Sequence, residues 1–364
     1  MRDDNKSLPR KIPLWAKFLI DFFALGAALC VFALFHHVLP KDMSDSGTVI
    51  TKPSDFPQFQ LPSGNTDAPL STEEPFQTES PEETADVKED NTETPAPTAE
   101  PTATPEPTIL PGNRVTLSEY NGDEGVMKLE KVEIGNGENK VTYYVANVYV
   151  KNVSGIKAGL AEDKYGLNYR ESVESIARRH NAIIAFTGDN YGSQSEDGND
   201  KGVVIRNGVL YRNDPNIYDM CVLFSDGRMV TYSPEDFDAE EMIKKGAWQA
   251  WTFGPMLLDG QGNVLEKFNV RNYIRERHPR NAIGYVEPGH YVFVTVDGRD
   301  RGYSIGANIT KLAEIMASEG CNTAYNLDGG ASAIMYCGLD IDDIVNQPNR
   351  NGRDVSDVIY FGGN

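Results

Sequence analysis

Polar side chains that could bind or cleave a substrate follow apolar runs at several points of this 364-residue sequence. The densest group lies in the stretch YNLDGGASAIMY and consists of Asn326, Asp328, Gly329, Gly330 and Ser332. Asp-Gly is a common turn dipeptide, so one interpretation is a hairpin turn. Glycines also let a substrate approach the backbone closely. The other interpretation is therefore an active-site corner that presents a carboxylate and a hydroxyl to a substrate.

Asp, Asn, Arg and Gly residues gather at the ends of other apolar runs as well. These groups are Gly188-Asp189-Asn190, Pro279-Arg280-Asn281, Asp297-Gly298-Arg299 and the single Arg353. Asp297 and Asp328 each follow a strongly apolar run and precede Arg or Gly-Ala-Ser rather than a returning strand. We therefore expect these two residues to be more than turns. The Asp-Gly pairs that begin at Asp226 and Asp259 lie inside predicted hairpins, and we expect turns there.

Several familiar catalytic and cofactor motifs are missing. The sequence has no HExxH, no zinc-spaced Cys/His set, no P-loop, no GxSxG and no GxGxxG after a strand. We therefore predict neither a metal site nor a cofactor. The cysteines are too few for a disulfide framework. Cys321 and Cys337 flank the YNLDGGASAIMY stretch and could pair, but we expect both to be buried as small apolar residues.

Six segments, in their order along the chain, resemble the phosphodiester glycosidase family. They are GVVIRNGVLYR, FGPMLLDG, PRNAIG, VTVDGR, NLDGGASAIMY and RDVSDVIYF. The resemblance covers roughly residues 182–363, and the NLDGG(A/G)S corner is its most specific element. The family's best-known activity removes N-acetylglucosamine from a sugar-1-phosphate diester. Two positions depart from the family pattern: Thr187 stands where an Asn usually precedes Gly188, and Asn281 stands where a Thr usually follows Arg280.

The resemblance implies a role for each polar group. Arg280 and Arg299 would hold the phosphate through paired hydrogen bonds. Asp328 and Asp297, with Asp189 as a third candidate, would stabilise an oxocarbenium-like transition state. The other residues implied in substrate binding are Gly188, Asn190, Asn326, Gly329, Gly330, Ser332 and Arg353. Phosphate leaves more readily than a sugar alkoxide, so the lack of an obvious His acid is consistent with this chemistry.

The elements that must position these residues belong to one domain, residues 113–364. KVTYYVANVYV alternates like a strand, and the ranges 202–212, 220–232, 250–265 and 281–299 each read as a hairpin. Two helices are expected, at Tyr169–His180 with Asn168 as cap and at Asn308–Gly320 with Asn308 as cap. We predict an α+β fold with mixed, mainly antiparallel β-sheets and flanking helices.

The N-terminal third of the chain is built differently. Residues 15–39 form an apolar run long enough to span a bilayer, and the basic tail 1–14 precedes it. No small-residue cleavage site follows, so we expect an uncleaved single-pass anchor with the N-terminus in the cytoplasm and the domain outside. Residues 40–112 are rich in Pro, Thr and Glu and carry −12 of the formal −20 charge. This composition predicts a disordered linker.

The leading hypothesis is a membrane-anchored extracellular hydrolase of sugar-1-phosphate diesters in wall or exopolysaccharide glycans. A glycosyl-phosphate transferase and a non-catalytic polysaccharide-binding module remain alternatives, and Thr187 favours the binding module. The expected partners are a glycan or sugar-phosphate substrate and the membrane. The acidic charge of residues 113–364 argues against nucleic acid. The sequence leaves the oligomeric state open.

Overall fold

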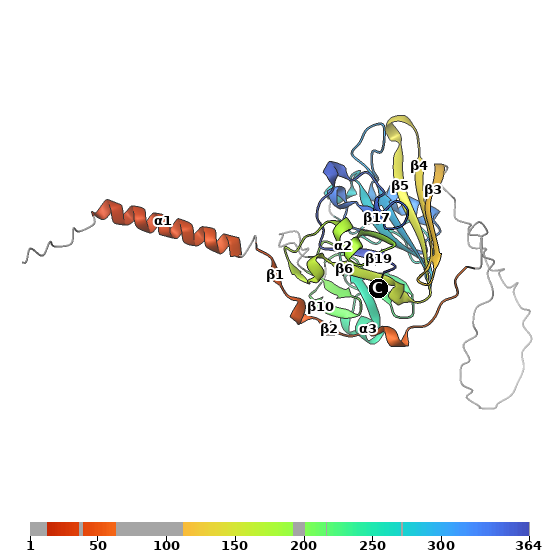
Figure 1. Ribbon diagram of the computed structural model, residues 1–364, viewed down its shortest axis with the longest axis horizontal. Helices are drawn as coiled ribbons and strands as arrows, with labels where there is room; N and C mark the ends of the chain where they lie inside the picture. The colour runs from red at the N-terminus through yellow and green to blue at the C-terminus, as the bar shows by residue number, and fades with distance from the viewer. Residues whose placement is uncertain are drawn as a thin grey trace, which may run out of the picture.

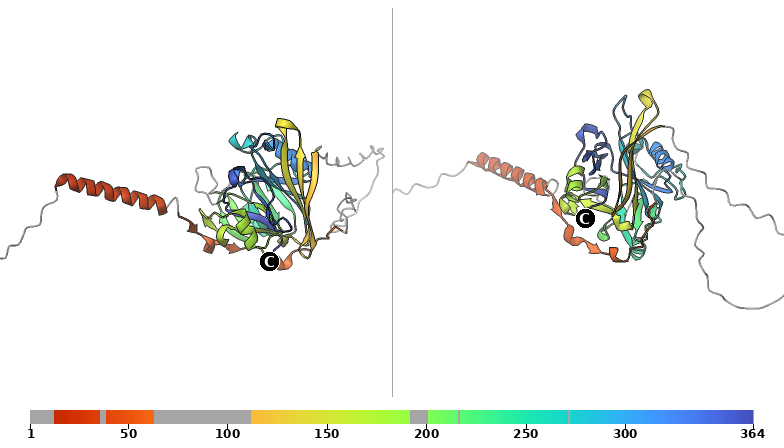
Figure 2. Two further views of the ribbon diagram at one scale, coloured as in Figure 1. Left: turned by 45° about the horizontal axis from the view of Figure 1, so that its top comes forward. Right: turned by 45° about the vertical axis from the view of Figure 1, so that its right-hand side comes forward.

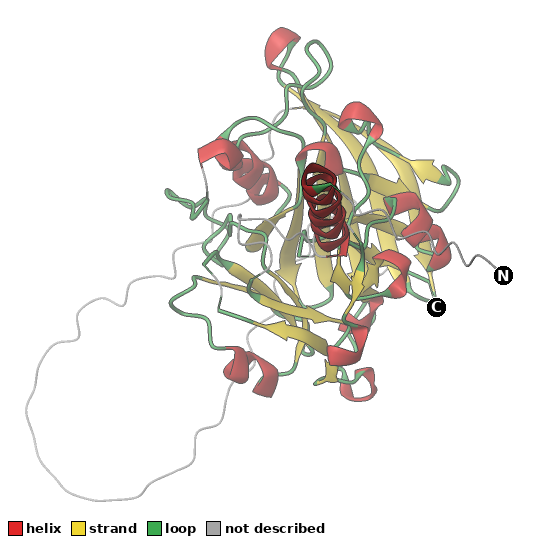
Figure 3. Cartoon of the chain, turned by 90° about the vertical axis from the view of Figure 1, so that its left-hand side faces the viewer, coloured by secondary structure: helices red, strands yellow, loops and turns green. Residues whose placement is uncertain are grey.

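The computed structural model describes residues 13–35, 39–62, 112–191, 201–215, 217–270 and 272–363. A separate N-terminal helix precedes one folded domain (Figure 1). Strands make up most of this domain, and short helices lie around them (Figure 3). Each strand pairing within the described ranges is antiparallel. The predicted α+β class with mainly antiparallel sheets is confirmed.

The first sheet contains the longest strands and supports the candidate site. Its strands lie in the order β16-β14-β15-β5-β4-β3. They are β3 (Gly112–Gly122), β4 (Gly125–Ile134), β5 (Val141–Val150), β14 (Arg280–Glu287), β15 (His290–Val296) and β16 (Thr323–Leu327). Valine and tyrosine side chains are frequent in β5, as expected for a strand of a half-buried or buried sheet.

Two further sheets complete the domain. The second sheet has the order β12-β11-β13-β9-β10-β2, and the third has the order β18-β17-β8-β19-β6. The second contains β2 (Thr48–Val49), β9 (Val203–Arg206), β10 (Val209–Asn213), β11 (Met220–Phe224), β12 (Met229–Tyr232) and β13 (Ala247–Trp251). The third contains β6 (Ile156–Leu160), β8 (Ile184–Thr187), β17 (Met335–Cys337), β18 (Asp343–Ile344) and β19 (Asp357–Phe361). A separate pairing joins β1 (Lys41–Asp42) to β7 (Gly166–Leu167).

The helices of the domain are short. They are α2 (Val173–Arg179), α3 (Ala239–Lys244), α4 (Asn272–Arg275) and α5 (Ile309–Ser318). Asn308 caps α5 as predicted, because its side chain accepts a hydrogen bond from the Lys311 N–H at 2.8 Å. The predicted cap of α2 is wrong. Ser172 caps that helix by accepting from the Ser175 N–H, whereas Asn168 lies earlier with a positive φ of 62°.

The main core lies where the three sheets meet. Phe186 of β8 stacks on Phe293 of β15 with 4.6 Å between ring centroids, and Trp251 of β13 belongs to the same cluster. A second cluster covers the opposite face of the first sheet, where Leu312 and Ile315 of α5 pack on its apolar side chains. The first sheet is thus covered on both faces and close-packed, so it can hold side chains at its strand ends in fixed positions.

The strand register brings the predicted site groups together. Arg280 at the start of β14 pairs with Val296 at the end of β15, and Asn281 pairs with Leu327 at the end of β16. Arg280, Arg299 and Asp328 therefore lie together on one side of the first sheet, where the start of β14 meets the ends of β15 and β16. We call this side the edge of the first sheet. The Asp328 N–H donates to the Gly188 carbonyl at 3.1 Å, which joins the end of β8 to the same edge.

Predicted hairpins and cysteine states agree with the structure, with one exception. β9–β10, β11–β12 and β14–β15 are hairpins. The expected hairpin at 250–265 is only partly formed: an isolated antiparallel bridge joins Leu258 to Val264 around the Asp259-Gly260 turn, and Met256 bridges to Tyr325. The first apolar run therefore also pairs with β16, where the Leu257 N–H donates to the Ala324 carbonyl at 2.9 Å. The three cysteines of the domain are free and buried.

The described N-terminal helix, α1 (Leu14–Ala33), is shorter than the predicted span of residues 15–39. Its side chains are not buried, and it extends away from the domain (Figure 1). By length and composition it is able to cross a membrane. Residues 36–38 of the predicted span and the whole of residues 1–12 lie outside the described residues.

Residues 39–62, which we call the strap, differ from the prediction of a disordered linker that begins at residue 40. β1 and β2 of the strap pair with β7 and β10 of the domain. Phe56 is 8% exposed and packs edge-on against Trp248 with 5.2 Å between ring centroids. The strap follows the edge of the domain in each view of Figure 2. The composition of residues 40–112 as a whole is dominated by Pro, Thr and Glu, so the few apolar residues of the strap were overlooked in the prediction. The rest of the predicted linker, residues 63–111, lies outside the described residues.

Candidate active site

A cavity of 560 Å³ opens at the edge of the first sheet where the predicted site groups meet. Its lining residues are Asn190, Phe253, Tyr273, Ile274, Glu276, His278, Arg280, Arg299, Asp328, Gly329, Gly330, Ala331, Arg350 and Arg353. Four of them are arginines and two are carboxylates, so the lining carries a net positive charge. The whole chain has a formal charge of −20. An anionic ligand is therefore favoured in this cavity despite the acidic protein around it.

Asp328 is the more enclosed of the two carboxylates that line the cavity. Its residue is 7% exposed, and its carboxylate pairs with Arg353 Nη2 at 3.0 Å. Burial raises the pKa of Asp328 above its ordinary value, while Arg353 and a hydrogen bond from Ser332 oppose that shift. Arg353 also donates from Nε to Ser332 Oγ at 2.7 Å. These contacts fix the carboxylate against the cavity wall.

Both glycines of the corner are required by their surroundings. A Cβ on Gly329 would lie 2.7 Å from the Pro279 carbonyl oxygen, closer than real Cβ atoms come. Gly330 has a φ of 66°, and its N–H donates to the same carbonyl at 2.9 Å. The Arg299 guanidinium lies 3.4 Å from the position that a Gly330 Cβ would occupy. Because Gly330 carries no side chain, the Arg299 guanidinium lies directly against the backbone of the corner.

Arg280 is a buried cation that no acid neutralises within the described residues. It is 3% exposed, and its Nε donates to the Ala307 carbonyl at 3.0 Å. Its Nη2 donates to the carbonyls of Ile274 and Glu276. Burial, with a smaller effect from Arg299, lowers the pKa of Arg280 to about 10. The guanidinium stays charged at neutral pH, so an anion in the cavity would supply the missing counter-charge.

A hydrogen bond between Arg299 and His278 fixes the tautomer of the histidine. Arg299 Nη2 lies 3.0 Å from His278 Nδ1, and His278 Nε2 lies 2.9 Å from the Tyr273 carbonyl oxygen. Because a guanidinium only donates, Nδ1 must accept and Nε2 must carry the proton. Burial, above all, lowers the pKa of His278. His278 is therefore a neutral support for Arg299 rather than a proton donor to a substrate.

Three side chains fix the corner from below. Asn281 Nδ2 donates to the carbonyls of Asp328 and Ser332 at 2.7 and 3.2 Å. Thr187 Oγ1 donates to the Ser332 carbonyl at 2.5 Å. Thr187 and Asn281, the two positions that depart from the family pattern, thus both act as buried supports of the backbone behind Asp328. Ser332 itself is buried and ties Arg353 to the corner.

Asp189 lies outside the cavity lining, in a buried ion-pair cluster. It is 2% exposed and accepts from the Thr252 N–H at 2.7 Å. Arg206 lies between two carboxylates, 3.4 Å from Asp189 and 2.6 Å from Asp357. Two buried carboxylates share one guanidinium, and burial is the main reason that the pKa of Asp357 rises to about 6. The cluster joins β9 to β19 beneath the site.

Asp297 is also outside the lining, and its carboxylate is fully engaged. It is 1% exposed and accepts from Tyr303 OH at 2.8 Å, from Asn346 Nδ2 at 2.9 Å and from the Gln347 N–H at 3.0 Å. Burial raises the pKa of Asp297, while these hydrogen bonds oppose the shift. Asp297 therefore anchors the segment that begins at Asn346 and continues to Arg350 and Arg353 of the cavity.

The remaining predicted residues have supporting positions. Asn326 is fully buried and donates to the Gly254 carbonyl at 2.6 Å, beside Phe253 of the lining. Gly188 packs against Asp357 and leaves no space for a side chain. Asn190 lines the cavity, and its Oδ1 accepts from Arg170 Nη2 at 3.0 Å.

Sequence reasoning missed part of the site. Glu276, His278 and Arg350 line the cavity, and Arg170 interacts with Asp328 from behind Asn190. The position of His278 next to the Pro279-Arg280 pair was a usable signal. The others come from loops whose approach depends on the tertiary fold. Within the described ranges, no group of three or more His, Cys, Asp or Glu side chains is placed to hold a metal ion.

Comparisons with known proteins identify the family and the fold of the domain. The family model described as phosphodiester glycosidase matches residues 180–362, half of the chain. The SPbeta prophage-derived uncharacterized protein YomE of Bacillus subtilis (strain 168) is 34% identical over 173 residues, which are 46% of this chain and 26% of that protein. The match therefore spans about a quarter of the length of that relative.

Among solved structures, the catalytic domain of zebrafish N-acetylglucosamine-1-phosphodiester alpha-N-acetylglucosaminidase, auto-inhibited by its pro-peptide, superposes with a TM-score of 0.52. The identity is 19%, and the match covers 70% of this chain and 88% of the zebrafish chain. A hypothetical protein from Synechocystis matches with a TM-score of 0.43 and 13% identity, over 64% of this chain and 61% of that chain. At 19% identity, the zebrafish match indicates a shared fold.

Proposed function

The chain belongs to the phosphodiester glycosidase family, and from this premise we propose that it hydrolyses glycosyl phosphodiesters. The bond cleaved joins the anomeric carbon of a sugar to an oxygen of a phosphodiester. One observation carries the proposal: Arg280 and Arg299 have no acid partner among the described residues and line the same cavity as the enclosed Asp328. A phosphodiester supplies the anion that the arginines lack, and its sugar brings the carbon that a carboxylate can stabilise.

The arginines bind and orient the phosphate in this proposal. Arg299 is exposed to the cavity and lies against Gly330. Its Nη2 and Nη1 each use one N–H on His278 and Asn349, and the remaining N–H groups are available to phosphate oxygens. Arg280 contributes charge from a fixed position, because backbone carbonyls already hold its Nε and Nη2. The neutral His278 adds no competing positive charge and keeps Arg299 in place.

Asp328 is the catalytic residue. The transition state carries positive charge at the anomeric carbon, and a fixed carboxylate beside it lowers the energy of that state. The bond between the anomeric carbon and the phosphodiester oxygen breaks, and its electron pair leaves with the phosphate. Water then provides a hydroxyl to the carbon and releases a proton to solvent. Because phosphate is a good leaving group, a neutral His278 is no obstacle to this reaction.

Asp297 and Asp189 act as positioning residues rather than as direct participants. Asp297 anchors the segment that carries Arg350 and Arg353, and Asp189 fixes the backbone beneath Asn190. Both carboxylates have protein partners that would have to be displaced before either could contact a sugar. This assignment leaves Asp328 and Glu276 as the carboxylates that line the cavity.

We further propose that α1 anchors the protein and that the domain lies outside the cell. The bases of the tail precede the apolar helix, which favours a cytoplasmic N-terminus. A domain in that position meets wall polymers or exopolysaccharide, so sugar-1-phosphate diesters of such glycans are the proposed substrates.

The test uses the full-length protein in detergent and an N-acetylglucosaminyl phosphodiester with a small alcohol on the phosphate. We expect release of free sugar and of the phosphomonoester, and loss of both in Asp328→Asn. Sugar appearing on an added alcohol acceptor would identify a transferase. Binding without turnover would identify a binding module, and neither binding nor turnover of any glycosyl phosphodiester would overturn the proposal.

A further inference from the structure

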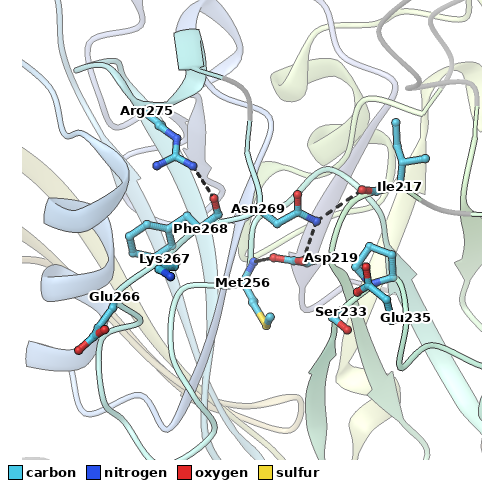
Figure 4. Close-up of a pocket in the computed structure, with 11 residues that line it drawn as sticks. Ile217, Asp219, Ser233, Glu235, Met256, Glu266, Lys267, Phe268, Asn269 and Arg275 are labelled. Carbon is cyan, nitrogen blue, oxygen red and sulfur yellow. Dashed lines mark hydrogen bonds between the residues drawn. The ribbon is translucent and has the colours of Figure 1, made fainter.

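A second cavity, of 920 Å³, is shown in Figure 4 with its lining residues. It lies next to the candidate active site, because Arg275 lines it while Ile274 and Glu276 line the cavity at Asp328. One wall comes from the ends of β11 and β12, and the other comes from the segment that follows β13. The lining residues are Ile217, Asp219, Ser233, Pro234, Glu235, Met256, Glu266, Lys267, Phe268, Asn269 and Arg275. The cavity is larger than the 560 Å³ cavity at Asp328. Its size admits a ligand of more than one ring.

The floor of the second cavity is rigid. Asp219 is 1% exposed, and its carboxylate accepts from the Met256 N–H and from Asn269 Nδ2, both at 3.1 Å. Asn269 also reaches the Ile217 carbonyl at 3.4 Å (Figure 4). Tyr325 OH donates to the Asp219 carbonyl at 2.6 Å, which ties the floor to the first sheet. A ligand would therefore meet a preformed surface.

The rim of the second cavity is polar and carries charges of both signs. Glu235 and Glu266 are exposed, as are Lys267 and Arg275. None of these four has an ion-pair partner within the described part of the chain. Arg275 donates from Nη2 to the Phe268 carbonyl, whereas the side chains of Glu235, Glu266 and Lys267 remain available to a ligand. Partly buried Met256 and mostly buried Phe268 add apolar lining. Apolar surface with dispersed donors and acceptors suits sugar rings, which have both C–H faces and hydroxyl edges.

A thin wall separates the two cavities. Tyr273, Ile274 and Glu276 line the cavity at Asp328, whereas Arg275 between them lines the second cavity. Arg280 holds this wall from one side through the carbonyls of Ile274 and Glu276. From the other side, Arg275 Nη2 donates to the Phe268 carbonyl at 2.8 Å (Figure 4). A helix with its side chains is about 10 Å across, so a chain-like ligand in one cavity can extend into the other.

We propose that the second cavity binds sugar units of a glycan chain next to the phosphodiester that is cleaved at Asp328. This inference rests on the proposed function and adds a second binding site, which would favour a glycan chain over a small glycosyl phosphodiester. The cationic first cavity takes the phosphate, and the mixed lining of the second takes uncharged sugar rings.

The test compares two substrates with full-length protein in detergent. The short substrate is N-acetylglucosaminyl methyl phosphate, and the long one carries a tetramer of N-acetylglucosamine in place of the methyl group. Glu235→Ala and Lys267→Ala remove unpaired side chains from opposite walls. Lys244→Ala is the control, because that lysine is 78% exposed on α3 and does not line the cavity. We expect each cavity variant to raise KM for the long substrate about tenfold, the effect of one lost charged hydrogen bond, and to leave the short substrate unchanged.

The outcomes separate the two proposals. If the wild-type protein cleaves both substrates but the cavity variants affect neither, or affect both equally, the second cavity does not bind the glycan chain. If the wild-type protein cleaves neither, the proposed function fails, and calorimetry with the free tetramer decides the cavity. Tetramer binding that Lys267→Ala weakens and Lys244→Ala does not would support the second site. No tetramer binding would overturn it.

Discussion

At the scale of single residues, the charge on Arg280 is the main reason that we expect the cavity to bind an anion. A buried cation without a counter-ion is costly, and here the carbonyl dipoles of Ala307, Ile274 and Glu276 reduce that cost. Carbonyls reduce the cost but do not cancel the charge. The cavity therefore retains a positive potential that only a bound anion neutralises, and Arg299 adds to it from the surface.

Asp328→Asn should preserve the fold and remove most turnover. The amide can still accept from Arg353, which is half exposed and tolerates the loss of its partner. A transition state that develops positive charge loses its fixed carboxylate, and the expected loss is about 10²–10³ in kcat. Turnover of an N-acetylglucosaminyl phosphodiester and the melting temperature should be measured together. Full activity in a folded Asp328→Asn protein would remove Asp328 from the catalytic role.

Lysine substitutions should distinguish the two phosphate-binding arginines. Arg299→Lys should raise KM and leave the melting temperature unchanged, because Arg299 is exposed and a lysine cannot offer two parallel donors. Arg280→Lys should lower the melting temperature as well, because a single ammonium cannot reach the three carbonyls that the buried guanidinium holds. Equal kinetics in wild type and both variants would show that neither arginine contacts the substrate.

The Asp189–Arg206–Asp357 cluster predicts a pH dependence of stability. The folded-state pKa of Asp357 is raised from 3.8 to about 6, so folding favours the protonated carboxyl. The stabilisation of the fold by this group is fully present below pH 3.8 and is lost as the pH rises through 6. Asp357→Asn keeps a neutral side chain at every pH. The stability of this variant relative to wild type should therefore increase between pH 4 and pH 7. A difference that stays constant over this range, measured by denaturant unfolding, would contradict the raised pKa.

At the scale of elements, the site is built from strand ends that the first sheet holds in register. β14, β15 and β16 are antiparallel neighbours, so the start of one lies beside the ends of the other two. The loops that follow β13 and β17 then close over this edge. Arg280 lies on strand β14, whereas Arg299, Asp328 and Arg353 lie on segments between strands.

The strap should contribute to stability although it precedes the segment predicted as the domain. Phe56→Ala removes an aromatic ring from the main core and should lower the free energy of unfolding by about 3 kcal/mol. A fragment beginning at Gly112 should melt at a lower temperature than one beginning at Lys41, because it lacks β1, β2 and Phe56. Val49→Ala, at a residue that is 59% exposed, is a matched control and should have little effect. Identical melting of the two fragments would mean that the strap does not stabilise the domain.

Local signals made much of the fold predictable. The Asn-Gly and Asp-Gly turns specify their own hairpins, and Asn308 specifies the start of α5. The strap could not be predicted in this way, because Thr48 and Phe56 find partners only in strands far along the chain. The acidic, proline-rich residues that follow dominate the average composition of the region and favour disorder.

In the candidate site, too, local sequence signals predicted some residues, whereas others depend on contacts that only the fold creates. Asp328, its glycines, Arg280 and Arg299 were predictable as candidates, because each stands at an end of an apolar run. The sequence could not show that Asp189 and Asp297 are enclosed by partners. Arg206 and Asp357, or Tyr303 and Asn346, must first be brought together by the fold.

At the scale of the whole molecule, the strap changes how the domain is attached to α1. A protease cut within residues 41–62 would not fall in a free linker, because these residues are part of the packed structure. A protease site inserted within residues 63–111 should yield two pieces that remain together on a sizing column and separate in denaturant. Adding Phe56→Ala should promote their separation. Immediate release of the domain from the wild-type strap would show that its pairing is too weak to matter.

The strap also sets a working distance from the bilayer. Residues 34–40 join the end of α1 to the first strap strand, and seven residues extend at most about 25 Å. With α1 in a membrane, the long acidic segment that follows gives the catalytic edge no additional reach, since both of its neighbours, residues 62 and 112, belong to the domain. If the proposed function and this anchoring both hold, the protein would hydrolyse glycan phosphates as they emerge at the membrane surface, and polymers in the outer layers of a wall would lie beyond its radius of action.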